Sequence, residues 1–163
     1  MLYWFFGLPG SGKTHVAKIV SQMTGLPVYE GDSFHTEDDR RVIAAGAFTL
    51  ARRHAQLERI RLALQTAGTL DALVTHALPD KASRTLVRGL SGHASRLIYV
   101  TAPLTLIRKR LAARRDHHFG PELLDAWIPR HWEEPEGEDC FVIENGTDDR
   151  LLEAQLRKLC ADG

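Results

Sequence analysis

The feature that most constrains this chain is the run GLPGSGKT, Gly7 to Thr14, which matches the phosphate-binding pattern G-x-x-x-x-G-K-[ST] at every position. It follows the short apolar run LYWFF and precedes the amphipathic stretch KTHVAKIVSQMTG. A glycine loop between a buried strand and a helix lets backbone N–H groups curl around an anion at the helix N-terminus. The sequence therefore predicts a nucleotide-phosphate site made of Gly7, Leu8, Pro9, Gly10, Ser11, Gly12, Lys13 and Thr14.

Two side chains of this loop carry chemistry as well as geometry. Lys13 is placed to reach the β- and γ-phosphates, so we expect it to be catalytic as well as cofactor-binding. The Thr14 hydroxyl is the expected Mg²⁺ ligand. ATP and Mg²⁺ are therefore the predicted cofactors. The alternative, a chance glycine turn, is disfavoured because the loop lies between a strand pattern and a helix pattern.

Beyond the loop, strand patterns alternate with helix patterns along the whole chain. The expected strands are LYWFF, LPVYE, LDALVTHA, SRLIYVTAP and CFVIEN. Alternation of this kind predicts an α/β fold, a parallel sheet with helices on both faces. The 163 residues suit one domain spanning 1–163. The helix pattern PELLDAWIPRHW is expected to break near Pro129.

Composition excludes several classes of function. The formal net charge is zero, so we expect no nucleic-acid partner. No apolar run is long enough for a membrane span, and the apolar N-terminus lacks the basic leader of a signal peptide. Cys140 and Cys160 form no metal-binding pair, and two thiols in a chain of this size predict a reducing, cytoplasmic location.

The stretch GDSFHTEDD places a carboxylate where a ligand of an open α/β sheet would bind. The third expected strand ends in Thr75 and His76, and its only acid, Asp71, lies at the wrong end. Asp32 follows the second strand, so it is expected to face the phosphate loop. There it would accept the proton of an attacking hydroxyl or hold a magnesium-bound water. The alternative is that it caps the following helix.

The residues after Asp32 are less specific. His35 is expected either to hydrogen-bond an acceptor substrate or to cap the helix. Glu37, Asp38 and Asp39 are expected to form a solvated first helical turn that favours the helix dipole.

Three stretches together resemble the gluconate kinases, within the shikimate and gluconate kinase group of small P-loop phosphotransferases. The first is GLPGSGKT, and the second is GDSFHTEDDRRVIAAGAF, which ends near a glycine expected to open an acceptor pocket. The third is RRDHHFGPELLDAWIPRHWEEPEGED, after the fourth expected strand. The order of elements extends this resemblance over nearly the whole chain.

The resemblance implies a five-stranded parallel sheet of the nucleoside monophosphate kinase type, ATP as donor, and a small lid at about 114–121. It also implies contacts to an acidic, polyol-like acceptor. The implied acceptor-binding residues are Asp32, His35, Lys81, Arg84 and His118.

A physical argument supports the lid independently, because arginines that close over a transferring phosphoryl group stabilise its charge. Arg110 and Arg114 lie one helical turn apart and share a face, so we expect both to bind nucleotide and Arg114 to be catalytic. Arg115 falls in the same lid. The alternative is a basic surface helix.

The chain departs from the gluconate kinase pattern in the acceptor half. The segment AFTLARRHAQLERI has no carboxylate before Glu58, and HALPDK places His76 where the pattern has a serine. Arg52, Arg53 and His54 either line a different pocket or form an exposed helix face. Two other functions therefore stay open: a nucleotide or nucleoside kinase, and a nucleotide-binding regulatory module without transfer activity. A homodimer is also possible by resemblance.

Overall fold

The computed structural model describes residues 1–45, 47, 49–69, 71–89, 94–113 and 120–161. Within these ranges five strands form one sheet in the order β2-β3-β1-β4-β5, and all neighbouring pairs are parallel. The strands are β1 (Leu2–Phe6), β2 (Val28–Glu30), β3 (Ala72–Thr75), β4 (Ser95–Thr101) and β5 (Phe141–Glu144). The predicted parallel five-stranded α/β fold is confirmed.

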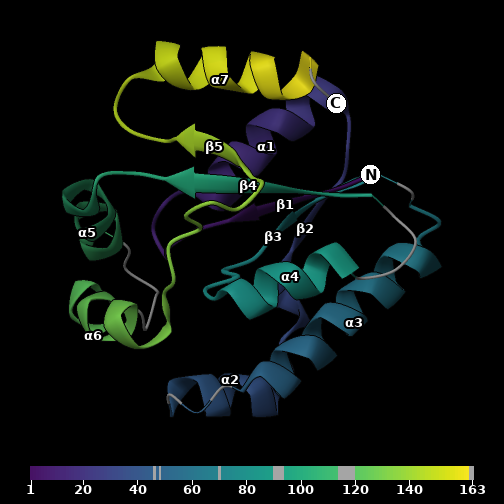
Figure 1. Ribbon diagram of the computed structural model, residues 1–163, viewed down its shortest axis with the longest axis vertical. Helices are drawn as coiled ribbons and strands as arrows, with labels where there is room; N and C mark the ends of the chain where they lie inside the picture. Colours follow the sequence, from purple (N-terminus) through teal and green to yellow (C-terminus); the bar gives the residue numbers. More distant parts are fainter. Residues whose placement is uncertain (46, 48, 70, 90–93, 114–119, 162–163) are drawn as a thin grey trace.

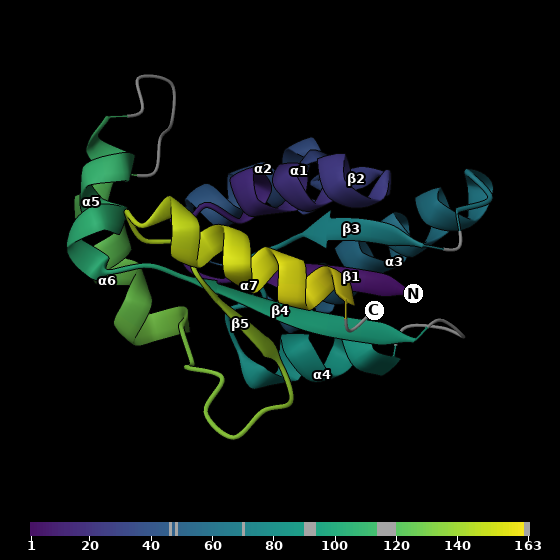
Figure 2. The same ribbon diagram turned by 90° about the horizontal axis from the view of Figure 1, so that it is seen from above.

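Helices cover both faces of this sheet and its carboxyl end (Figure 1). One face carries α1 and α7, and the other carries α3 and α4, while α5 and α6 lie beyond the tips of the strands (Figures 1 and 2). The helical elements are α1 (Lys13–Thr24), the 3-10 helix η1 (Gly31–Phe34), α2 (Glu37–Ala44), α3 (Leu50–Thr66), α4 (Lys81–Gly89), α5 (Leu104–Ala112), α6 (Pro121–His131) and α7 (Asp149–Ala161).

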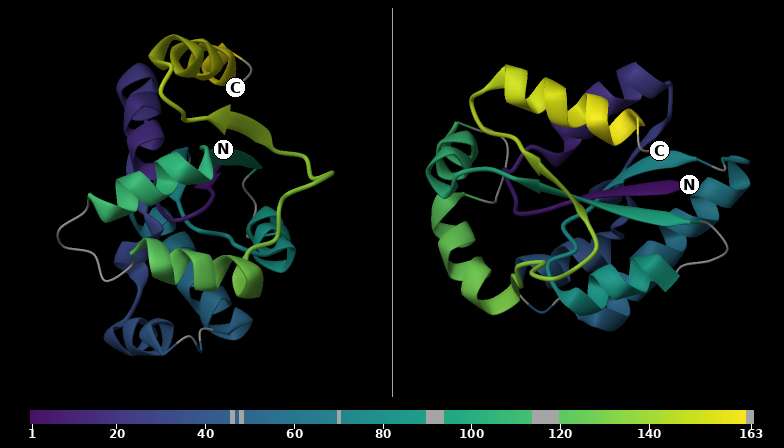
Figure 3. Two further views of the ribbon diagram at one scale, coloured as in Figure 1. Left: turned by 90° about the vertical axis from the view of Figure 1, so that its left-hand side faces the viewer. Right: turned by 45° about the horizontal axis from the view of Figure 1, so that its top comes forward.

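The alternation of side chains along β1 divides the core into two layers. Leu2, Trp4 and Phe6 face α3 and α4, whereas Phe5 faces α1 and α7. All four side chains are buried, which is the pattern of a strand covered on both faces. Because β1 is central, the loop that follows it emerges at the middle of the sheet's carboxyl edge, the side that faces the viewer in the left view of Figure 3.

The helix α6 differs from its expected form. The sequence predicted a break near Pro129, but the helix runs through this proline to His131. Pro129 lies in the last turn, so only one late intrahelical bond is lost, and the backbone N–H of Trp132 still bonds the Ile128 carbonyl at 2.9 Å. Across the ranges that the structure describes, no helix is both long and apolar enough to cross a membrane.

Candidate active site

The loop from Gly7 to Thr14 has a backbone that only glycine fits at its key positions. Gly7, Gly10 and Gly12 have φ of 147°, 85° and 95°. A Cβ on Gly7 would lie 2.2 Å from the Val100 carbonyl oxygen, and one on Gly12 would lie 2.0 Å from Asn145 Nδ2. The loop is therefore packed closely against the ends of β4 and β5.

The start of α1 fits a bound phosphate. Gly12 is its N-cap and gives no side-chain cap, so the first-turn N–H groups suit an anionic ligand. Lys13 Nζ donates to the carbonyl oxygens of Gly7 and Leu8, each at 3.0 Å, which holds the ammonium over the loop. Thr14 is half-buried on the first turn of the helix. These residues fit a nucleotide and its magnesium ion.

Two side chains from distant elements brace the loop at Ser11. Asn145 Nδ2 donates to the Ser11 carbonyl at 2.7 Å, and Arg110 Nη1 donates to the same oxygen at 3.2 Å. Arg110 Nη2 also donates to the Asn145 carbonyl at 3.0 Å. The structure thus places Arg110 beside the loop, on its backbone. Asn145 is a residue that the sequence analysis missed.

The predicted lid is only partly described. Arg114, Arg115 and His118 fall in residues 114–119, which lie outside the described residues, as does the expected pocket glycine, Gly46. The roles of Arg114 and His118 therefore stay predictions.

Asp32 lies in η1, directly after β2 and at the carboxyl edge of the sheet, where its side chain is exposed. It does not cap α2, because the cap is Thr36, whose side chain accepts from the Asp39 N–H at 3.0 Å. The backbone N–H of His35 bonds the Asp32 carbonyl at 3.3 Å. Burial lowers the pKa of His35, and the negative charges of Asp32 and Asp39 oppose this shift. Asp32 and His35 are therefore neighbours on one short turn.

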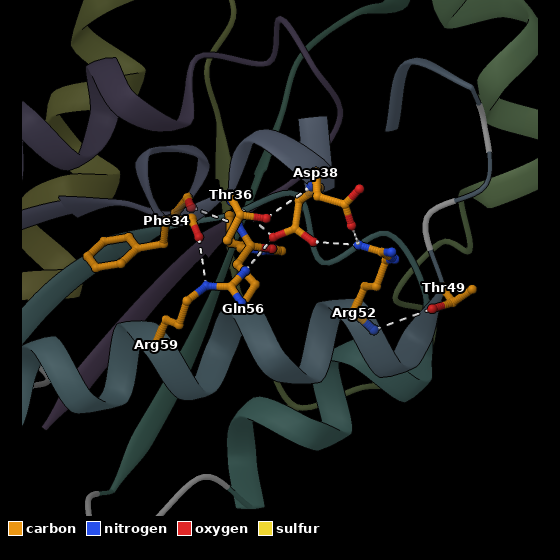
Figure 4. Close-up of polar contacts among 10 residues, drawn as sticks. Phe34, Thr36, Asp38, Thr49, Arg52, Gln56 and Arg59 are labelled. Atoms are coloured by element: carbon orange, nitrogen blue, oxygen red, sulfur yellow. Dashed lines mark hydrogen bonds and ion pairs between the residues drawn. The ribbon is translucent and has the colours of Figure 1, made fainter. Parts of the chain in front are cut away.

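Asp39 was predicted to be solvated, and this is wrong. Its side chain is only 5% exposed and accepts hydrogen bonds from Thr36 N at 3.0 Å, Arg59 Nη2 at 2.5 Å and Arg52 Nη1 at 3.3 Å. We call these contacts the Asp39 hub (Figure 4). Arg59 Nε also donates to the Phe34 carbonyl at 3.0 Å, so the hub joins η1, α2 and α3. The arginines come from a later helix, which sequence reasoning did not link to this turn.

The buried imidazole of His76 lies within electrostatic reach of three other basic groups. Burial lowers the pKa of His76 well below its ordinary value, and Arg53, His35 and Lys13 each lower it further by charge repulsion. Lys13 from α1, His35 after η1 and Arg53 from α3 therefore all act on the imidazole at the end of β3.

Arg53 also lines a hollow of about 280 Å³ beside this region. The walls come from the start of α3, from Pro79 and Asp80, and from the last turn of α6 with Trp132 and Glu133. Arg53 Nε lies 4.0 Å from Asp80 Oδ2, and burial lowers the pKa of the guanidinium against the opposing charge of Asp80. We call this the Arg53 hollow. Arg52 belongs to the Asp39 hub instead, and His54 is exposed.

The two basic residues predicted to contact the acceptor differ in their surroundings. Arg84 is fully buried: its Nη2 donates to Glu138 Oε1 at 2.7 Å and its Nη1 to the Leu78 carbonyl at 3.1 Å. This internal pairing leaves the predicted acceptor contact of Arg84 without support. Lys81 is exposed at the start of α4, and its role stays a prediction.

Comparisons with known proteins agree with this geometry. The family model described as AAA domain matches residues 2–128. The chain is 32% identical to a cytidylate kinase of Desulfurococcus amylolyticus over 128 residues, which is 76% of this chain but only 66% of that protein, just under two thirds. It is 26% identical to a probable gluconokinase of Mus musculus over 139 residues, covering 74% of this chain and 76% of that one.

Among solved structures, a sugar kinase from Janibacter sp. superposes with a TM-score of 0.78 at 24% identity, over 98% of this chain and 94% of that one. At this identity the likeness shows the fold. The family model, in contrast, spans most of the chain and includes the phosphate loop, η1 and α5. The chain therefore belongs to the AAA domain family, as a P-loop kinase domain whose likeness to the gluconate kinases is confirmed.

Proposed function

We propose that this protein transfers the γ-phosphoryl group of ATP to a hydroxyl of a small, acidic, polyol-like acceptor, gluconate or a related compound. The observation that carries the proposal is the placement of Asp32. Asp32 lies on the turn after β2, at the carboxyl edge of the sheet where the phosphate loop also emerges after β1, and a partly buried cation, Arg53, lines a hollow between α3 and α6. A carboxylate opposite a phosphate cradle suits hydroxyl activation, and a neighbouring arginine suits an anionic acceptor.

In this proposal the chain acts mainly by positioning and by stabilising charge. Lys13 exchanges the Gly7 and Leu8 carbonyls for phosphate oxygens, and the loop amides hold the phosphate chain. Asp32 accepts the hydroxyl proton, and His35 on the same turn orients the acceptor. Magnesium, which Thr14 would hold, supplies neutralisation of phosphate charge. Arg114 would close over the phosphates from the lid.

A second candidate is a nucleotide kinase, and the relationship with a cytidylate kinase favours it. The same cradle and the same Asp32 would serve either reaction. The difference lies in the acceptor half, where a nucleotide needs room for a base and a sugar acid needs only a cation and hydroxyl partners. The Arg53 hollow has a cation in its wall, which supports an acidic acceptor.

The test is acceptor-dependent ADP release. Purified protein with ATP and Mg²⁺ is assayed against gluconate, its neutral counterpart glucitol, cytidine and CMP, with Lys13→Ala as the inactive control. The proposal expects turnover with the sugar acid and little with glucitol. Preference for CMP would establish the nucleotide kinase. ATP binding without turnover on any acceptor would favour the regulatory module.

Arg53→Gln tests in the same assay whether Arg53 binds the anionic group of the acceptor. Loss of the cation is expected to raise the KM for the acidic acceptor while the KM for ATP stays the same. An unchanged acceptor KM would remove the anion-binding part of the proposal.

The location and partners belong to the same proposal. Cys140 and Cys160 are free thiols, which fits the proposed reducing, cytoplasmic location. A small-molecule acceptor is the expected partner, and a homodimer stays a prediction.

A further inference from the structure

A buried chain of side chains connects the end of β3 to the turn that carries Asp32. His76 is 4% exposed, and its Nδ1 accepts from the Leu78 N–H at 3.1 Å. Its Nε2 lies 3.0 Å from Gln56 Oε1. Gln56, on α3, is fully buried and its Nε2 donates to the Gly31 carbonyl at 2.7 Å. The chain therefore ends one residue before Asp32.

Both ends of this chain are backbone groups, so its direction is fixed. The Leu78 N–H can only donate, which makes Nδ1 of His76 an acceptor without a proton. The Gly31 carbonyl can only accept, which turns the amide oxygen of Gln56 toward His76. Nε2 of His76 must then carry the proton that Gln56 accepts. One tautomer and one amide orientation satisfy every group.

The surroundings keep this tautomer neutral. Burial lowers the pKa of His76 most, and the charged groups that face it, Arg53 from α3, His35 after η1 and Lys13 from α1, lower it further. Protonating Nδ1 would also direct its hydrogen at the Leu78 N–H. A protonated His76 ring, or a ring with its proton on Nδ1, would lose the hydrogen bond from the Leu78 N–H.

Gly31 shows how closely the two strand ends are packed. A Cβ at this position would lie 2.6 Å from the Thr75 carbonyl oxygen and 2.7 Å from His76 Cδ2. The backbone just before Asp32 therefore rests on the imidazole ring as well as on the Gln56 amide. On the other side, Leu78 has φ of 40°, in the left-handed region, and its bond to Nδ1 holds that turn.

We propose that His76 and Gln56 are positioning residues, which fix the Gly31 carbonyl and thereby aim Asp32 at the bound phosphate. The inference rests on the proposed function, because it assigns these residues to the same transfer reaction. Neither side chain touches a substrate in this scheme. They set the direction of the carboxylate, and a misplacement of about 1 Å costs up to about 10²-fold in rate.

Gln56→Leu is the first test, because it preserves size and burial but removes both hydrogen bonds. We expect kcat to fall on the order of 10-fold or more, with the affinity for ATP unchanged. Two variants in α3 are the controls: Gln65→Leu on the exposed face and Ile60→Val in the core. Both should keep kcat, although Ile60→Val lowers the melting temperature. A normal kcat in Gln56→Leu would overturn the inference.

The order of two His76 variants separates positioning of Asp32 from support of the Leu78 turn. The amide of glutamine reaches as far as Nε2, so His76→Gln keeps the donor to Gln56. The amide of asparagine reaches only as far as Nδ1, so His76→Asn keeps the acceptor for Leu78. We expect His76→Gln to retain more activity. The reverse order would show that the histidine serves the Leu78 turn alone.

Ring and amide NMR of the protein without acceptor keep this inference distinct from the proposed function. The ¹⁵N shifts of His76 should report a neutral Nε2–H ring, and the Asp32 and His35 amide signals should move in Gln56→Leu but not in Gln65→Leu. Static amide signals would overturn the positioning. Amides that move as expected, in a protein without any acceptor turnover, would overturn the proposed function and leave the positioning of the turn established.

Discussion

Asn145 donates its side-chain amide to the carbonyl oxygen of Ser11 over 2.7 Å, across 134 residues of sequence. Its own backbone N–H bonds the Thr101 carbonyl at 2.7 Å, which fixes Asn145 at the end of β4. The phosphate loop is therefore held from the side opposite η1 by a residue that follows β5. The close approach of Gly12 to Nδ2 makes this contact part of the loop's shape.

We expect Asn145→Asp to weaken nucleotide binding more than Asn145→Ala. The alanine removes one of the two hydrogen bonds to the Ser11 carbonyl, because Arg110 still donates to it, so the unfolding free energy should fall by about 0.5–1.5 kcal/mol. The aspartate adds repulsion, because its carboxylate faces the Ser11 oxygen and cannot donate. Calorimetric titration with a non-hydrolysable ATP analogue measures the order. Equal affinity in the aspartate variant and the wild type would refute the brace.

We expect Asp32→Asn to leave ATP affinity nearly unchanged and to reduce transfer by about 10²-fold, the scale of a lost general base. The amide keeps the size of the side chain but does not accept the hydroxyl proton. ADP release and analogue binding are measured together. Asp71→Asn is the control, since this exposed acid precedes β3 at the opposite end of the sheet and contacts the N-terminal amine. Wild-type turnover in Asp32→Asn would rule out the base.

Asp39 should make stability depend on acid pH. Burial raises the pKa of this carboxyl, but hydrogen bonds from Thr36 and Arg52 and the charge of Arg59 outweigh it, so the net shift is downward. A lowered folded-state pKa gives stabilisation that is complete above the ordinary aspartate value of about 3.9 and is lost as the pH falls through the lower folded value. Urea unfolding from neutral to acid pH measures this.

The matched pair for that measurement is Asp39→Asn and Asp38→Asn. We expect Asp39→Asn to lower the free energy of unfolding by about 1–3 kcal/mol at neutral pH. The difference in unfolding free energy between this variant and the wild type should become smaller below about pH 4. Asp38 also bonds Arg52, at 2.7 Å, but it is 66% exposed and should cost little. Equal losses in the two variants would contradict the hub.

Arg84 should behave as a structural residue. Arg84→Met leaves the carboxylate of Glu138 buried without its main partner, which typically costs about 3–5 kcal/mol. The pKa of Glu138 is lowered chiefly by the hydrogen bond from Arg84, consistent with a tight pair. The double variant Arg84→Met/Glu138→Leu should recover most of the lost stability. Thermal unfolding and acceptor KM are measured on all three proteins.

If Arg84 contacted the acceptor, the stable double variant would show a raised acceptor KM. We expect its KM to match that of the wild type. A wild-type KM would show that Arg84 has a structural role, and not the acceptor-binding role that the resemblance implied.

The parts of the fold that depend on local chemistry were predictable from sequence. LYWFF became β1 with the expected bounds, since a short apolar run followed by glycine suits a covered strand. Gly25 ends α1 with φ of 75°, a left-handed conformation that glycine adopts readily at a helix C-terminus. Asp148 accepts from the Arg150 N–H at 3.0 Å, as aspartate commonly does just before a helix.

The parts that depend on distant residues were not predictable. Asp39 reads as a solvated acid until α3 brings Arg59 to it from 20 residues away. His76 shows no spacing signal, because its partner Gln56 lies 20 residues earlier on another element. Pairing of this kind follows from the packing of α3 against η1 and β3, and the periodicity of the sequence does not predict it. The local sign of such a pairing is a polar residue on the apolar face of a helix pattern, as Gln56 is with Ile60 and Leu64.

The strand order has a consequence for how acceptor choice can change. β1 is bonded on both sides, whereas β2 is a three-residue edge strand that pairs with β3 alone. Opening fluctuations should therefore reach the turn after β2 well before they reach the glycine loop. In the proposed reaction, substitutions beside that edge would therefore change which acceptor is bound, while the glycine loop proposed to bind ATP stays fixed to the central strand.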